Sequence, residues 1–203
     1  MNELHLTPLI IPMAQALEQR IYTPDEYLEL ELEAETRSEF RNGVIIPMTG
    51  GTPDHNELAI NLAALLKLAV RGKPYRIFAM DQRLWIPDRQ LYTYPDVMVI
   101  AKPLQLQAGR KDTVTNPGLI AEVLSPSTHD YDHGAKFSAY RTLDSFQEYL
   151  LIDQYRIHVE HYVKTAAHQW LLSEYADPGM SLALITVEVT INILDLYENI
   201  DVK

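Results

Sequence analysis

One acidic residue inside an apolar stretch constrains this chain more than any other feature. Residues 119–124 read LIAEVL, and this short apolar run predicts a buried strand. Because side chains alternate along a strand, Glu122 shares one face with Ile120 and Leu124. An unpaired carboxylate buried there would cost several kcal/mol. The fold must therefore bring a cation, a hydrogen-bond donor or a metal ion to Glu122, and a structural ion pair would serve as well as a functional site.

The composition is that of an ordinary folded protein. Apolar residues make up 47% of the 203 residues and charged residues 22%, close to the globular average. A chain of this length usually forms one domain, so we expect an N-terminal arm over 1–20 and a single domain over 21–203. No stretch is apolar enough for a membrane span, which predicts a cytoplasmic protein without membrane contact.

The charge balance and the absence of cysteine exclude several classes of protein. Lys and Arg number 17 against 28 Asp and Glu, giving a formal charge of −11. That charge disfavours a protein that merely coats nucleic acid, but it allows an enzyme that meets nucleic acid through a metal ion. The chain has no cysteine, which excludes disulfides, thiolate metal sites and cysteine nucleophiles.

Start and stop signals along the chain predict helices that alternate with strands. A capping box of Thr23 and Glu26 predicts a helix over 24–35, and further helices are predicted over 53–71 and 129–143. The predicted strands are 44–46, 75–80, 84–86, 95–100, 119–124, 148–153, 156–163, 169–175 and 187–193. The polar segment 102–117 is predicted to be a mobile loop near the functional site. The order predicts an α/β fold with a mixed central sheet flanked by helices.

Three polar residues outside the apolar strand are candidate functional residues, and each also has a simple structural explanation. Asp96 begins a predicted strand, where an acid can simply be solvated. Glu39 is flanked by two arginines that offer a salt bridge. His55 lies in the first helical turn behind Gly50–Gly51, a place that could bind an anion but more often holds a structural residue.

The helix that follows the apolar strand carries a polar stripe. Asp132, Lys136 and Tyr140 stand at i, i+4 and i+8, so they share one helix face. On the surface, the first two would form an ion pair worth about 0.3–0.5 kcal/mol. Alternatively, the stripe faces a site beside Glu122.

The order of these residues resembles the Uma-type endonuclease family, a branch of the PD-(D/E)xK restriction-endonuclease-like superfamily. The resemblance covers residues 22–197 and is most specific at 95–97 and 122–128, followed by the polar stripe. Glu39 and His55 also fit the family pattern. The superfamily usually has a lysine two residues after the glutamate, where this chain has Leu124. In this family the lysine is supplied by the neighbouring helix, which corresponds here to Lys136.

The resemblance implies a restriction-endonuclease-like fold and hydrolysis of phosphodiester bonds, with DNA as substrate and Mg²⁺ or Mn²⁺ as cofactor. The implied metal ligands are Asp96, Glu122, the Val123 backbone carbonyl and, as a further ligand, Glu39. Lys136 would orient the attacking water or steady the scissile phosphate. The implied supporting residues are Glu39, His55, Asp132 and Tyr140.

Two rival functions stay open at this point. The chain could be a non-catalytic binding or regulatory module on a degenerate nuclease fold, which the acidic balance and Leu124 favour. It could also be a metal-dependent phosphoesterase that acts on RNA or nucleotides. For a DNA-cleaving enzyme, a homodimer could align two sites across a duplex. A basic rim of Arg83, Arg89, Arg110 and Lys111 could offset the overall charge.

Overall fold

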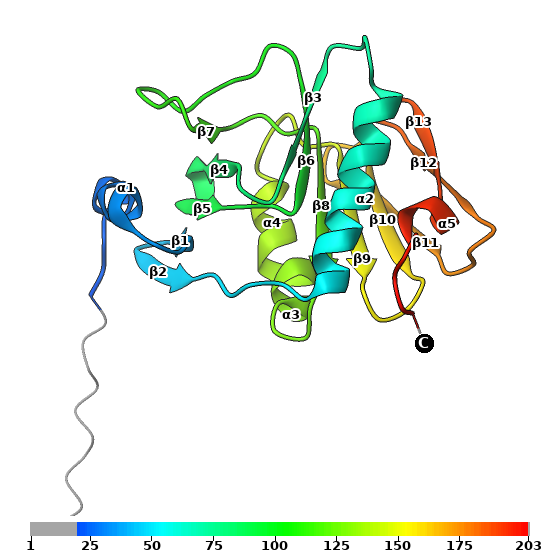
Figure 1. Ribbon diagram of the computed structural model, residues 1–203. Helices are drawn as coiled ribbons and strands as arrows, with labels where there is room; N and C mark the ends of the chain where they lie inside the picture. The colour runs from blue at the N-terminus through cyan, green and yellow to red at the C-terminus, as the bar shows by residue number, and fades with distance from the viewer. Residues whose placement is uncertain (1–19, 203) are drawn as a thin grey trace, which may run out of the picture.

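The computed structural model describes residues 20–202, so nearly all of the predicted N-terminal arm lies outside the described residues. A six-stranded sheet forms the centre (Figure 1). Its strands, in spatial order, are β11 (Gln169–Tyr175), β10 (Val159–Ala166), β9 (Glu148–Asp153), β8 (Leu119–Leu124), β6 (Val97–Ala101) and β3 (Tyr75–Ala79). The pair β8–β9 is parallel and the other pairs are antiparallel. The predicted mixed central sheet is therefore confirmed.

A second sheet contains the predicted strands 44–46 and 84–86, but the sequence did not predict that they join three further short strands in a sheet of their own. Its strands, in order, are β2 (Val44–Pro47), β1 (Ser38–Arg41), β5 (Leu91–Thr93), β4 (Arg83–Ile86) and β7 (Thr113–Val114). The 3₁₀ turn η1 (Pro87–Arg89) joins β4 to β5, and helix α1 (Pro24–Glu33) packs Tyr27 and Leu28 against this sheet. The predicted capping box starts α1, since Thr23 and Glu26 exchange side-chain-to-backbone hydrogen bonds.

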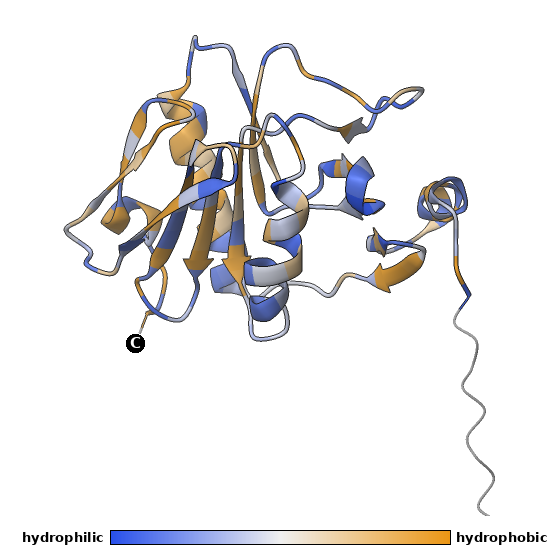
Figure 2. Cartoon of the chain, turned by 180° about the vertical axis from the view of Figure 1, so that it is seen from behind, coloured by the Kyte–Doolittle hydropathy of each residue, from blue (hydrophilic) through white to orange (hydrophobic). Residues whose placement is uncertain are grey.

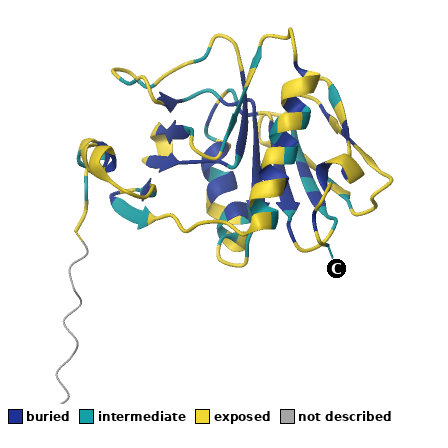
Figure 3. Cartoon of the chain, in the orientation of Figure 1, coloured by how far each residue is buried: buried dark blue, intermediate teal, exposed yellow. Residues whose placement is uncertain are grey.

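The two faces of the six-stranded sheet are covered by different elements. Helix α2 (Pro53–Ala69), the hairpin of β12 (Ser181–Leu184) and β13 (Val189–Asn192), and helix α5 (Ile193–Leu196) cover one face. The aromatic residues around α4 (Phe137–Tyr140) cover the other. Figure 2 shows the apolar residues concentrated on the central strands, and Figure 3 shows these strands as the most buried part. Among residues 20–202, no helix is long and apolar enough to cross a lipid bilayer.

The helix predicted over 129–143 is interrupted. It consists of α3 (His129–Tyr131), a π-helical turn η2 (Asp132–Lys136) and α4, and it ends at Tyr140, three residues earlier than predicted. Turns of this kind occur mostly as single insertions and often at functional sites. The insertion coincides with the polar stripe, so the stripe is built on a locally widened helix.

Segment 102–117 is largely loop, as predicted, but its predicted place near the functional site is wrong. Thr113 and Val114 are buried in strand β7, which pairs with β4 at the far edge of the small sheet. No residue of this segment lines the pocket described below, as far as the described chain extends. Pairing with β4 draws the segment away, and Figure 1 shows it in green beside the small sheet.

Two arginines of the predicted basic rim are engaged in ion pairs. The buried Arg83 guanidinium lies 3.5 Å from Glu31 and 3.2 Å from Asp112. Arg110 lies 2.6 Å from the same Asp112 carboxylate. These contacts hold the small sheet together, so Arg83 and Arg110 do not form a free basic surface.

Candidate active site

The register of two central strands places Asp96 beside Glu122. Strands β6 and β8 run antiparallel with Val97 opposite Ala121, which puts the residue before β6 opposite Glu122. The Asp96 N–H donates to Glu122 Oε2 at 3.4 Å, and Asp96 Oδ2 accepts the Val123 N–H at 2.7 Å. The sheet itself therefore fixes the two carboxylates side by side.

The polar stripe of the following helix points at Glu122. The Lys136 Nζ lies 3.0 Å from Glu122 Oε1 and 3.2 Å from Asp132 Oδ1. The Tyr140 hydroxyl donates to Glu122 Oε1 at 2.6 Å. Because all four side chains are buried, this is not the surface ion pair that the sequence left open. Lys136 thus reaches the acids from the helix, although position 124 has no lysine.

The small sheet contributes Glu39 to the same place. Glu39 Oε1 lies 4.0 Å from the Lys136 Nζ and also accepts a hydrogen bond from the Thr93 hydroxyl. Its other oxygen accepts from Arg41 Nε at 2.8 Å, so the salt bridge anticipated from the sequence is present. The Arg41 guanidinium lies over the Tyr131 ring, 3.5 Å from its centroid. Arg41 is therefore held between the sheet and the helix.

His55 approaches from helix α2. Its Nε2 lies 3.3 Å from Asp96 Oδ2, and Thr52 caps the helix just before it. Burial opposes protonation of the ring, but the Asp96 carboxylate outweighs it and raises the pKa of His55 above its ordinary value. His55 thus supports Asp96.

These residues line one pocket of about 500 Å³. The predicted site residues on its wall are Glu39, His55, Asp96, Glu122, Val123, Asp132 and Lys136. Tyr140 lies buried behind Glu122 and does not line the pocket. The wall also contains residues that the sequence analysis did not assign to the site, Arg41, Thr52, Tyr131 and Gln154 among them. Strand periodicity could have identified Arg41, because it stands two residues from Glu39 and so shares its face.

Two buried glutamates in neighbouring strands have opposite electrostatic surroundings. Glu148 on β9 accepts hydrogen bonds from the N–H groups of Ile185 and Thr186 and from His161, and these donors outweigh burial and lower its pKa. Burial raises the pKa of Glu122 to about 8, and the nearby Asp96 carboxylate adds to the rise against the opposing effect of Lys136. A carboxyl perturbed by burial and by a like charge in a pocket is typical of functional sites.

The donor set fits a divalent cation. The pocket holds four carboxylates, those of Glu39, Asp96, Glu122 and Asp132, against the two permanent cations Lys136 and Arg41. Within residues 20–202, no three His, Asp or Glu side chains are grouped to hold a metal by themselves. Mg²⁺ commonly takes one or two carboxylates and completes its shell with water and substrate phosphate, so the pair Asp96 and Glu122 matches its needs.

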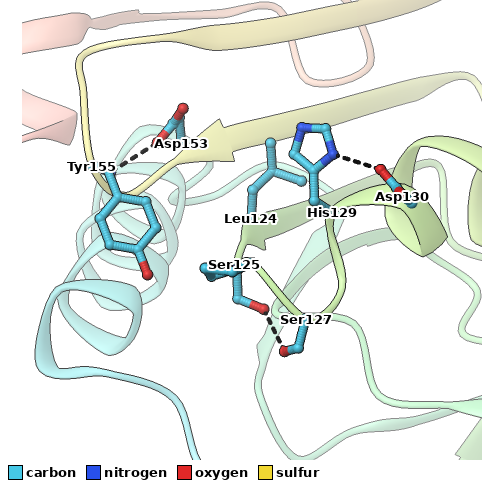
Figure 4. Close-up of a pocket in the computed structure, with 8 residues that line it drawn as sticks. Leu124, Ser125, Ser127, His129, Asp130, Asp153 and Tyr155 are labelled. Carbon is cyan, nitrogen blue, oxygen red and sulfur yellow. Dashed lines mark hydrogen bonds and ion pairs between the residues drawn. The ribbon is translucent and has the colours of Figure 1, made fainter.

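A second pocket of about 410 Å³ adjoins the first and shares the segment 125–127 and Tyr155 with it. Figure 4 shows Tyr155 and His129 on opposite sides, with Leu124 and Ser125 between them. The charged side chains on its wall are Asp130 and Asp153, and neither Lys nor Arg lines it. This flank of the site therefore offers a phosphate group no Lys or Arg side chain.

Comparison with known proteins gives consistent results. The chain matches the Uma2 family model, described as "Putative restriction endonuclease", over residues 24–194. An uncharacterized protein of Synechocystis sp., sll1609, is 49% identical over 155 residues, which cover 76% of this chain and 88% of the relative. A second one, slr1290, is 33% identical over 175 residues, covering 85% and 90%.

The fold also matches a solved structure. A crystal structure described as a putative nuclease belonging to DUF820, from Anabaena variabilis, aligns with a TM-score of 0.69 at 20% identity. The alignment covers 86% of this chain and 97% of that one, which shows a shared fold. Because the family model matches most of the chain, the chain belongs to the Uma2 family.

Proposed function

We propose that this protein is a divalent-metal-dependent nuclease that hydrolyses phosphodiester bonds, with DNA as its substrate. The observation that carries the proposal is the adjacent pair Asp96 and Glu122 with a buried lysine amine 3.0 Å from Glu122. Membership of the family described as "Putative restriction endonuclease" supports the choice of nucleic acid.

The metal ligands in this proposal are the Asp96 and Glu122 carboxylates and the Val123 carbonyl, and the ion is Mg²⁺ or Mn²⁺. When bound, such an ion neutralises charge on a phosphoryl group and lowers the pKa of a bound water. It would also add positive charge to a pocket in which four carboxylates face only two permanent cations, Lys136 and Arg41. Glu39, already bonded to Arg41 and Thr93, acts on the site through these residues and through Lys136.

The other side chains position the reacting groups. The Tyr140 hydroxyl fixes one oxygen of Glu122, and the His55 ring fixes one oxygen of Asp96. Lys136 keeps its proton, because the surrounding carboxylates outweigh burial and raise its pKa well above the ordinary value. A protonated amine suits the role of orienting water or steadying the scissile phosphate, but not that of a general base.

The non-catalytic alternative loses one of its supports in this geometry. The missing lysine at position 124 favoured a degenerate site, yet the Lys136 amine lies within ion-pair distance of Glu122. The acidic net charge of −11 is the support that is left. A homodimer that aligns two sites across a duplex stays a prediction of this proposal.

Cleavage of supercoiled plasmid DNA tests the proposal. Wild-type protein is expected to nick the plasmid with Mg²⁺ or Mn²⁺ and not with EDTA. Asp96→Asn is expected to lower the rate at least about a hundredfold, since loss of outer-shell partners alone costs about 10–100-fold. The matched control is Asp144→Asn, at an exposed residue outside the pocket.

Two results would contradict this account. Cleavage that survives EDTA, or that is equal in Asp96→Asn and wild type, would exclude the assigned metal site. Cleavage of a short RNA but not of the plasmid would instead replace DNA with the alternative substrate class.

A further inference from the structure

The pocket of about 500 Å³ that contains the four carboxylates is the acidic pocket. A third pocket, of about 260 Å³, lies on another flank of it. It shares Arg41 and Tyr131 with the acidic pocket, so the two are joined at these residues. Its remaining wall includes Asn42 and Arg89 together with small and apolar side chains. No Asp or Glu lines this pocket, in contrast to the flank that carries Asp130 and Asp153.

The fold places Arg89 beside Arg41 although 47 residues separate them in the chain. Strands β1 and β5 pair Arg41 with Leu91, and the Asn42 N–H donates to the Gln90 carbonyl at 2.9 Å. Gln90 has a left-handed backbone, with φ of 46°, which ends the 3₁₀ turn that contains Arg89. Arg41 at the end of β1 and Arg89 in the turn before β5 therefore line the same pocket.

Both arginines retain capacity to bind an anion. Arg89 is exposed and forms no ion pair with any residue in 20–202. Arg41 donates to Glu39 through Nε and one terminal nitrogen, and its flat face rests on Tyr131. Because a guanidinium carries five N–H donors, a fixed Arg41 keeps donors for a ligand at the pocket.

We propose that the pocket lined by Arg41 and Arg89 binds a backbone phosphate of the nucleic acid next to the scissile one. This inference rests on the proposed nuclease function and adds the direction of the bound strand. The strand leaves the acidic pocket across Arg41 towards Arg89 and away from Asp130 and Asp153. Local contacts between these arginines and a phosphate let a chain of net charge −11 bind a polyanion.

Fluorescence anisotropy with a fluorescein-labelled DNA duplex tests this site in the full chain. The measurement uses EDTA buffer at several salt concentrations, so cleavage does not interfere. Arg89→Ala is expected to weaken binding at least about tenfold, because it removes a hydrogen-bond donor to a charged group. It should also make the salt slope shallower by about 0.9, the value for one lost phosphate contact on B-DNA.

Two further variants separate a phosphate contact from other effects. Arg89→Lys keeps the charge and should restore most of the salt slope. Arg71→Ala removes an exposed arginine that lines none of the three pockets and should leave both affinity and slope unchanged.

The outcomes distinguish this inference from the function on which it rests. If wild type binds and Arg89→Ala has the same affinity and slope, the phosphate site is wrong and the nuclease proposal stands. If Arg71→Ala matches Arg89→Ala, the effect is one of overall charge and the site is wrong. If wild type binds the duplex neither in EDTA nor with Ca²⁺ in its place, the DNA proposal and this inference are both overturned.

Discussion

Lys136→Met is expected to abolish cleavage and to destabilise the protein by about 3–5 kcal/mol, the range for removing one partner of a buried ion pair. Lys136 is buried against Glu122 and Asp132, with Glu39 at 4.0 Å. Without the amine, no other cation lies within ion-pair distance of Glu122 in residues 20–202. The rate should fall at least about 10²-fold, as for loss of one preorganised donor.

The pH dependence of this loss identifies its cause. Glu122 ionises with a pKa of about 8 while Lys136 is present, so the ion pair between them strengthens as pH rises through that value. The free-energy loss in Lys136→Met should therefore be larger at about pH 9 than at about pH 6. Lys67→Met, at an exposed position of α2, is the control and should cost little at either pH. A Lys136→Met variant with wild-type cleavage would remove lysine from the mechanism.

Glu122→Gln is expected to lose cleavage and yet to be more stable than wild type in the absence of metal at alkaline pH. The folded protein holds a proton on Glu122 up to about pH 8, whereas the unfolded chain releases it near 4.5. Folded wild type therefore binds more protons in this window, and its free energy of unfolding falls as pH rises through it. A glutamine at position 122 does not ionise, so the variant lacks this fall in stability at alkaline pH. Its side-chain oxygen still accepts a hydrogen bond from the Tyr140 hydroxyl. A gain in stability with a loss of function is typical of functional sites.

Glu148→Gln is the matched control, because Glu148 is equally buried in the adjacent strand. Its folded pKa lies below the ordinary value, so its contribution to stability is present above about pH 4.5 and lost as pH falls through the folded pKa. Glu148→Gln should therefore destabilise the protein at neutral and alkaline pH. Urea denaturation in EDTA at several pH values measures both variants. Equal effects of the two substitutions at every pH would contradict the opposite pKa shifts of Glu122 and Glu148.

The core of the site could be predicted from the sequence because its signals are local. Glu122 within an apolar run indicated a buried acid that needs a partner, and the spacing of Lys136 and Tyr140 indicated one helix face. The structure brings these groups together within hydrogen-bond and ion-pair distance. The π-helical turn at 132–136 could not be predicted, because polar residues spaced at i, i+4 are equally expected on one face of an uninterrupted α-helix.

The small sheet could not be predicted, and the flank of the site that it builds was missed with it. Its strands have two to four residues, too few for a period-two pattern to stand out. Segment 102–117 looked like a free loop because its pairing partner, β4, is distant in the chain. Arg41 was interpreted only as a partner of Glu39, whereas its contact with Tyr131 depends on how the sheet meets the helix.

The most direct test of the metal site is calorimetric titration of Mn²⁺ into wild type and Glu122→Gln. We predict that wild type binds one ion per chain and that Glu122→Gln shows no specific binding. Affinity in wild type should increase as pH rises towards about 8, because the ion competes with the proton on Glu122. Absence of binding to wild type, or equal binding to both proteins, would contradict the claim that Asp96 and Glu122 hold a catalytic metal.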